Sequence, residues 1–214
     1  MLPCSFCGET LHLMPSGAMF WPAGGLLAVS DLHLGRSERF ARRGGALLPP
    51  YETHATLEKL DQDIDATGAS TVVCLGDSFD DLAAANGLDD TSRLWLARLI
   101  AGRTWIWIIG NHDPGPVELG GCHRSELSMR PFTFRHIADP ADRAEISGHY
   151  HPKAQLAGQW RPCFLVDSTR LILPAYGTYT GGLRCDDPAL ATLMAPDALA
   201  VLTGPRVLAI PMPR

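Results

Sequence analysis

Short apolar runs recur through the first half of the chain and predict buried strands. The runs are LLAVS from Leu26, TVVCL from Thr71 and TWIWIIG from Thr104, and each ends at glycine or polar residues. A strand that is apolar on both faces is typical of a sheet covered on both sides. Upstream of these runs, residues 10–13 and 18–21 predict a β-hairpin.

Amphipathic segments separate these runs and predict helices. In residues 52–67, Leu57, Leu60 and Ile64 recur at helical spacing. A second helix is predicted over residues 91–101, where leucines recur in the same way. This alternation of strand and helix predicts βαβ units and a mostly parallel sheet.

Beyond residue 130 the pattern changes to short strands separated by turns. The strands are predicted at PFTF, AEIS, CFLV, RLIL and RVLAI, which indicates a second, mixed sheet packed on the first. With 214 residues, of which 46% are hydrophobic, the chain has enough apolar material for one substantial core. We therefore expect a single domain over residues 1–214.

Cysteine usage and the absence of long apolar runs predict a cytoplasmic protein. No run approaches the roughly 18 apolar residues that span a bilayer, and the opening MLPCSFCGET lacks the pattern of a signal peptide. The six cysteines are scattered through a chain of a size that needs no disulfides, so free thiols are expected. Cys4 and Cys7 form a CxxC without a second pair, which we interpret as incidental.

The net charge of −5 argues against nucleic-acid binding chiefly through a basic field over the whole surface. A local basic patch remains possible in GRSERFARRGG. Its arginines, Arg36, Arg39, Arg42 and Arg43, are interpreted either as a phosphate-binding patch or as the solvated face of a helix.

Polar residues follow each of the three apolar runs. In open α/β sheets, ligands bind beyond the carboxyl ends of the strands, so these residues are expected to meet in one crevice. They are Asp31 and His33, then Asp77, Asp80 and Asp81, then Asn111, His112 and Asp113.

A fourth contribution comes from ISGHYHPKA. His149 and His151 occupy alternate positions, which point to the same side of an extended segment. Alone, the pair is equally well explained as two surface histidines. Together with the aspartates and the asparagine it forms an oxygen and imidazole set, which suits manganese, iron or zinc. The candidates outnumber the ligands of one ion, so two ions bridged by a carboxylate are expected.

These motifs resemble the calcineurin-like metallophosphoesterases, whose pattern is DxH, GDxxD, GNH, a single histidine and GHxH. His136 supplies the single histidine, with His123 as its only rival between the neighbouring motifs. The resemblance implies a four-layer α/β/β/α sandwich of two mixed sheets. It implies one ion held by Asp31, His33, Asp77 and His151, and a second held by Asp77, Asn111, His136 and His149.

A narrower resemblance, over about residues 11–183, is to the PdeM family of bacterial ligase-associated DNA damage response endonucleases. It implies a manganese-dependent phosphodiesterase that acts on DNA, with a DNA-repair ligase or helicase as partner. A hydroxide bridging the metals would attack phosphorus in line, and His112, oriented by Asp80, would protonate the leaving group. Arg36 and Arg39 would hold substrate phosphates.

Three questions stay open at this point. The same metals would serve a phosphatase or nucleotide hydrolase acting on small esters, and some proteins of this fold are non-catalytic scaffolds. A scaffold is disfavoured because every motif residue is present. Asp113 either supports the metal ligands or caps a helix near Pro114.

Overall fold

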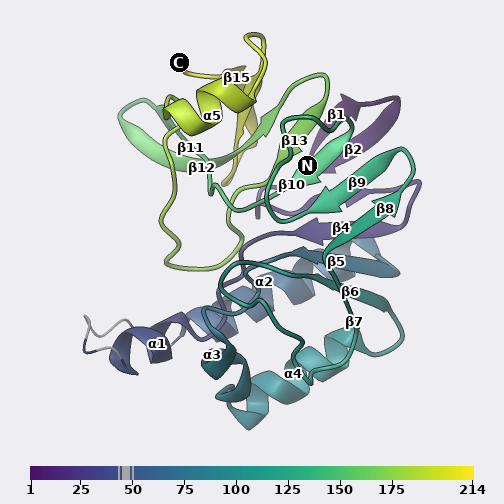
Figure 1. Ribbon diagram of the computed structural model, residues 1–214, viewed down its shortest axis with the longest axis vertical. Coiled ribbons are helices and arrows are strands. Elements are labelled where there is room, and N and C mark those ends of the chain that lie inside the picture. The colour runs from purple at the N-terminus through teal and green to yellow at the C-terminus, as the bar shows by residue number, and fades with distance from the viewer. Residues whose placement is uncertain (43, 45–48, 50) are drawn as a thin grey trace.

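Two mixed β-sheets packed face to face form the centre of the computed structural model (Figure 1), which describes residues 1–42, 44, 49 and 51–214. In the described part of the chain, the first sheet has seven strands in sequence order. They are β1 (Leu2–Phe6), β2 (Glu9–Leu13), β3 (Met19–Trp21), β4 (Leu26–Val29), β5 (Thr71–Leu75), β6 (Thr104–Ile108) and β7 (Cys122–Arg124). From β1 to β4 neighbouring strands are antiparallel, and from β4 to β7 they are parallel.

The second sheet has the order β15-β14-β12-β13-β10-β9-β8, with β11 paired to β12. Its strands are β8 (Glu126–Met129), β9 (Phe132–Arg135), β10 (Glu145–Ser147), β11 (Lys153–Leu156), β12 (Gln159–Val166), β13 (Arg170–Ile172), β14 (Leu199–Leu202) and β15 (Leu208–Pro211). Here β10 is parallel to both of its neighbours, whereas the other pairs are antiparallel.

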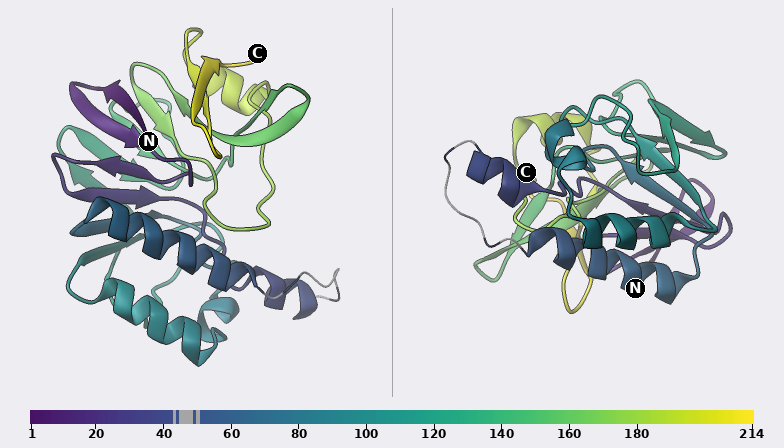
Figure 2. Two further views of the ribbon diagram at one scale, coloured as in Figure 1. Left: turned by 180° about the vertical axis from the view of Figure 1, so that it is seen from behind. Right: turned by 90° about the horizontal axis from the view of Figure 1, so that it is seen from below.

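Helices cover the outer faces of both sheets. The first sheet carries α2 (Glu52–Thr67) and α4 (Asp90–Ile100), which lie together on one face in Figure 2. The second carries α5 (Pro188–Leu193), and two short helices, α1 (Arg36–Arg42) and α3 (Leu82–Asn86), follow β4 and β5.

Three apolar clusters lie between these layers, one under α2 and α4, one between the sheets and one under α5. The middle cluster joins Val73 of the first sheet to Phe134 and Phe164 of the second. The predicted α/β/β/α sandwich is therefore confirmed.

The strongest sequence patterns gave the most accurate element boundaries. α2 spans the residues predicted for it and ends at Gly68, whose left-handed backbone lets its N–H reach the Ile64 carbonyl. α4 begins one residue earlier than predicted, where the Asp89 side chain accepts a hydrogen bond from the Ser92 N–H. The edge strands β1 and β7 were not predicted, because the burial of β1 alternates and β7 has only three residues. The interior strand β14 was not predicted either.

All six cysteines are free, as the sequence predicted. In the described segments, no helix has both the length and the apolar character that a membrane span requires.

A buried ion pair fixes the start of β10. Arg170 Nε donates to Glu145 Oε2 at 2.8 Å, and both side chains are almost fully buried. The Asp139 N–H donates to the other carboxylate oxygen at 2.7 Å. The Arg170 Nη1 and Nη2 groups donate to the carbonyls of Leu193 and Asp139, both at 2.7 Å, so the pair is held from several sides.

We predict that Glu145→Ala lowers the free energy of unfolding by about 3–5 kcal/mol, because Arg170 would be left as a buried charge without its carboxylate. Glu126→Ala is the matched control. Its carboxylate also pairs with an arginine, Arg135, but it is about half exposed, so a loss under about 1 kcal/mol is expected. Urea denaturation of the two variants measures the difference, and equal losses would contradict the buried-pair account.

Candidate metal centre

The segments after β4 and β5 remain hydrogen-bonded beyond the ends of the strands. Asp31 N–H donates to the Gly76 carbonyl at 3.2 Å, and His33 N–H donates to the Asp77 carbonyl at 3.0 Å. Because β4, β5 and β6 are parallel, their carboxyl ends lie at one edge of the sheet. The polar residues that follow the three runs therefore meet, as the pattern predicted.

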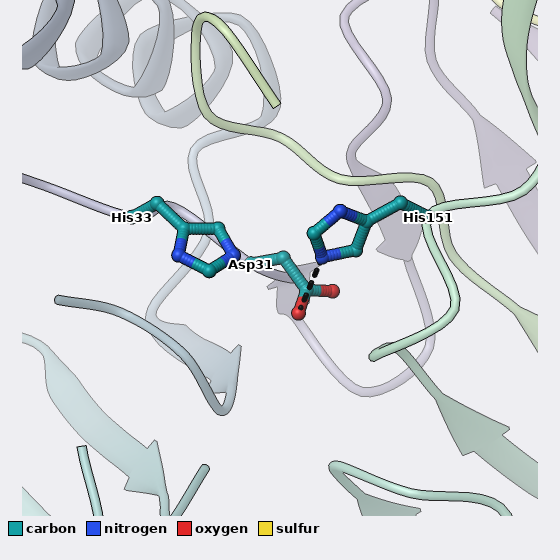
Figure 3. A group of neighbouring side chains, drawn as sticks. All are labelled: Asp31, His33 and His151. Carbon is teal, nitrogen blue, oxygen red and sulfur yellow. Dashed lines mark ion pairs between the residues drawn. The ribbon is translucent and has the colours of Figure 1, made fainter. Parts of the chain in front are cut away.

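One cluster consists of Asp31, His33 and His151 (Figure 3). One ligand atom from each residue lies within 4.8 Å of the others. His151 Nε2 is 3.1 Å from Asp31 Oδ1, the contact drawn as a dashed line. His151 follows β10 of the second sheet, so this cluster draws side chains from both sheets.

A second cluster consists of Asp77, His136 and His149, with Asn111 beside it. His136 Nε2 lies 2.9 Å from Asn111 Oδ1, 3.4 Å from Asp77 Oδ2 and 3.3 Å from His149 Nδ1. The other His136 nitrogen, Nδ1, is 2.8 Å from the Leu75 carbonyl, which fixes a proton on Nδ1. Nε2 then faces the oxygen atoms of Asn111 and Asp77.

The donor set fits a divalent cation. Asp31 Oδ2 accepts hydrogen bonds from Ser30 Oγ and from the His149 N–H, whereas Asp31 Oδ1 is buried, makes no hydrogen bond and has only the His151 Nε2 contact at 3.1 Å. His33 Nε2 is also buried without a hydrogen-bond partner. Buried polar atoms are normally satisfied, so two such atoms in one cluster of ligands indicate a site built to hold a cation.

The backbone is strained at the same residues. Among the described residues, nine other than glycine have positive φ. Five of them are in the two clusters: Asp31, His33, Asp77, His149 and His151. Such conformations cost about 1–3 kcal/mol each and are kept where the surroundings enforce them, typically at functional sites.

Two glycines allow the segments to approach closely. A Cβ on Gly148 would overlap Ser30 Oγ and press on Asp31 Oδ2. A Cβ on Gly110 would overlap the backbone and the carboxylate of Asp77. Glycine at these positions is therefore a requirement of the packing between motifs.

Asp113 ties the second and third motifs together. Its carboxylate accepts hydrogen bonds from the N–H groups of Asp77 and Gly110 at 3.1 Å, Ser78 at 2.8 Å and Phe79 at 3.2 Å. Burial and the nearby Asp77 charge raise its pKa to about 6, although these N–H groups favour the anion. No helix begins here in the described chain, so the capping alternative is wrong, and Asp113 instead supports the motif that carries Asp77.

The charge of Asp77 is stabilised by its neighbours. Burial alone would raise its pKa, but His136 and the His112 N–H, which donates to Oδ1 at 2.8 Å, lower the pKa to about 2. Conversely, burial opposes the charging of His136, yet the carboxylates of Asp77 and Asp31 raise its pKa. The negative charge of Asp77 and a positive charge on His136 therefore stabilise each other.

Asp80 binds the arginines of α1. Arg36 Nη1 donates to Oδ1 at 3.1 Å, and Arg39 Nη1 donates to Oδ2 at 2.9 Å. His33 Nδ1 lies 2.9 Å from Oδ1. Burial disfavours the carboxylate charge, but these three partners hold the pKa of Asp80 well below its usual range.

Arg36 and Arg39 therefore face the site, with side chains only 19% exposed, and the solvated-face interpretation is wrong for both. Arg42 is more exposed and pairs with Asp81 at 2.8 Å. The helix is held by Ser37, whose N–H and Oγ both donate to Glu52 Oε1 of α2. Arg43 lies outside the described residues.

His112 lies beside Asp80 and Arg39. Its Nδ1 is 3.1 Å from the main-chain carbonyl of Asp80 and 3.3 Å from Arg39 Nη1. Asp80 thus contacts His112 through its backbone, while its carboxylate is occupied by His33 and the arginines. Sequence reasoning could name the pair of residues but could not distinguish these two contacts.

The remaining histidines lie elsewhere. His123 Nε2 accepts a hydrogen bond from the Val117 N–H at 3.2 Å, and its ring stacks on Trp107. His12 packs near Phe20, and His54 lies 3.8 Å from Asp89. His136, and not its rival His123, is the histidine beside Asp77.

A cavity of about 210 Å³ joins these groups. It is lined by His33, Arg36, Arg39, Asp77, Asn111, His112, His149, His151 and Gly181. A second cavity, of about 350 Å³, borders Asn111 and His136 and extends to Arg135 and Ile137. The two cavities share Asn111, so the centre lies in an open cleft.

The family model of calcineurin-like phosphoesterases matches residues 25–194, well over half of the chain. The chain belongs to this family. Family members use divalent metals, and metal-dependent phosphoesterase chemistry is the function that this membership supports.

Solved structures include two similar proteins. The Pseudomonas putida nuclease MPE superimposes with a TM-score of 0.76 and 28% sequence identity, over 98% of this chain and 99% of that chain. Yfce, a phosphoesterase from E. coli, superimposes with a TM-score of 0.42 and 11% identity, over 88% of this chain and 99% of that chain. No curated protein sequence matched the chain.

We predict that Gly148→Ala weakens binding of a divalent metal about 10- to 100-fold, because the added methyl group would displace Ser30 and Asp31. Gly181→Ala serves as the control, since no atom lies within 4 Å of its Cβ position although Gly181 also lines the cleft. Calorimetric titration with Mn²⁺ measures both. Equal affinities would show that the close approach at Gly148 has no bearing on the metal ligands.

Proposed function

We propose that this protein is a two-metal phosphodiesterase that cleaves DNA as an endonuclease in bacterial DNA repair. The observation that carries the proposal is the pairing of two adjacent ligand clusters with the arginines of α1 in one cleft. Two cations beside guanidinium groups suit a substrate whose reacting centre is an anionic phosphodiester.

Each ion would use four side chains, and Asp77 would bridge them. The first set is Asp31, His33, Asp77 and His151, and the second is Asp77, Asn111, His136 and His149. Mn²⁺ suits the oxygen and imidazole donors, as do iron and zinc ions. When bound, such a pair supplies an activated water and neutralises charge on the phosphoryl oxygens.

His112 would hold the proton for the leaving oxygen. The Asp80 carbonyl and the Arg39 guanidinium contact its Nδ1 and orient the ring, which leaves Nε2 to face the substrate. A histidine in this position contributes by donating its Nε2 proton as the bond to the leaving oxygen breaks.

Arg36 and Arg39 would bind phosphate oxygens. Each donates one Nη1–H group to Asp80, and both side chains line the cleft. Each guanidinium group therefore has further N–H donors, and its planar fork suits phosphate.

DNA as the substrate is supported by the similarity to the Pseudomonas putida nuclease over nearly the full length of both chains. The open cleft also suits a polymer better than an enclosed pocket would. A DNA-repair ligase or helicase as partner belongs to the same proposal, and so does a cytoplasmic location.

We expect Mn²⁺-dependent hydrolysis of an aryl phosphodiester and of DNA. Asp77→Asn should abolish both activities, because both clusters lose their shared carboxylate. His112→Ala should lower turnover about 10²- to 10⁴-fold while metal content stays unchanged, because it removes the proton donor but no ligand. His123→Ala, a histidine outside the cleft, is the control and should retain full activity.

If the protein hydrolyses phosphomonoesters but leaves DNA intact, it is a small-molecule phosphatase or nucleotide hydrolase and not a nuclease. Metal binding without turnover of any ester would instead indicate a non-catalytic scaffold. Steady-state rates on one protein preparation, with metal content measured in parallel, separate these outcomes.

We further expect Arg39→Ala to raise KM for DNA and to reduce the dependence of KM on salt concentration, because a phosphate contact is lost. Arg42→Ala, on the same helix but paired with Asp81 and more exposed, should change KM little. The same KM and salt slope for Arg39→Ala as for the wild type would contradict a phosphate contact at Arg39.

A further inference from the structure

Trp160 and Arg184 form an exposed stacked pair outside the metal centre. Trp160 is 45% exposed, whereas the other four tryptophans, all in the described part of the chain, are buried or half-buried. The guanidinium carbon of Arg184 lies 5.1 Å from the centroid of the Trp160 ring. A single exposed tryptophan is ordinary in a folded protein, so its surroundings decide what it can do.

The pair borders a cavity of about 220 Å³. Lys153 and Gln155 of β11 line it together with Trp160 and Arg184, and so does Asp186. Asp186 accepts hydrogen bonds from Arg184 Nε at 2.9 Å and from Nη2, so part of the positive charge is neutralised. The cavity thus combines an aromatic face, two cations, an amide and one carboxylate.

Two chain segments connect this cavity to the metal centre. Lys153 comes two residues after His151, a separation of at most about 7 Å along an extended chain. The second segment is the loop between β13 and α5, which lines the metal cleft at Gly181 and the cavity at Arg184. Lys153 Nζ donates to the Thr180 carbonyl at 3.3 Å, and Lys153 also forms a parallel bridge with Arg184.

We propose that the cavity at Trp160, Arg184 and Lys153 binds a nucleotide of a single-stranded polynucleotide whose scissile phosphodiester lies at the metal centre. The inference rests on the proposed phosphodiesterase function and names its substrate class as a strand several nucleotides long. An unpaired base stacks on the indole, and the lysine and arginine bind a neighbouring phosphate. A base held within a duplex has no free face for such a contact.

The arrangement of the fold fits a strand that crosses the cleft. Figure 1 shows α1 and the β11–β12 hairpin on different sides of the loop between β13 and α5. A strand bound at both places would contact Arg36 and Arg39 in the metal cleft and Trp160 beyond the loop that carries Gly181 and Arg184. An aryl diester lacks the neighbouring nucleotide that would occupy the cavity at Trp160.

Asp186 gives the proposal a second test with the opposite sign. Its carboxylate competes with a phosphate for Arg184 and repels the strand. Asp186→Asn should therefore tighten binding of a polynucleotide, whereas Trp160→Ala should weaken it. A role in folding alone would not produce this pair of opposed changes.

The experiment measures binding of a fluorescein-labelled oligothymidylate of about twelve nucleotides by anisotropy, with the full chain in EDTA so that no strand is cut. Trp160→Ala should bind about tenfold more weakly, Trp160→Phe should keep most of the affinity, and Asp186→Asn should bind more tightly. Leu94→Ala is the control, because Leu94 is an exposed apolar residue on α4.

With Mn²⁺ added, the ratio of DNA cleavage to aryl diester turnover should fall about tenfold in Trp160→Ala and stay constant in Leu94→Ala. Binding that is unchanged in Trp160→Ala, or weakened in Asp186→Asn, would overturn the proposal. If DNA is cleaved but its binding does not depend on Trp160, the nucleotide site is wrong and the nuclease function stands. If binding depends on Trp160 but no DNA is cleaved, the nuclease function is wrong and the nucleotide site stands.

Discussion

Four aspartates are buried around one cleft, and the arrangement of the site depends on how their charges are compensated. Asp113 is held by four backbone N–H groups, and Asp80 by two arginines and a histidine. Asp31 and Asp77 each lie beside imidazole nitrogens, at 3.1 Å from His151 and 3.4 Å from His136. Carboxylates cannot be buried so close together without such partners. The fold must therefore bring the arginines, histidines and backbone N–H groups of the motifs to these four aspartates.

The first sheet and the candidate ligands could be predicted from sequence because both depend on local order. Apolar runs such as TVVCL fix buried strands, and in a parallel sheet the residues after each strand meet without further information. The order of the motifs made His136 the expected ligand beside Asp77 but left His123 as a rival. Its alternative, His123, is excluded only by three-dimensional structure, because nothing in the surrounding sequence separates the two.

Other features depend on contacts between distant residues, which periodicity does not encode. Arg36 and Arg39 have the spacing of a solvated helical face, yet a carboxylate more than 40 positions away turns both toward the cleft. Asp113 has the context of a helix cap, but none of the described helices begins there. Strands β7 and β14 escaped prediction for a related reason, since a three-residue or partly exposed strand is stabilised by its neighbours in the sheet and not by its own pattern.

Each cluster of ligands combines residues that follow strands of the first sheet with residues that follow strands of the second. An ion held as proposed would therefore join the two halves of the sandwich at one rim, in addition to the apolar contacts between their inner faces. Binding to the folded state alone stabilises that state by mass action. Metal supply would then govern how firmly the two halves are held together, and so the lifetime of the folded protein in the cell.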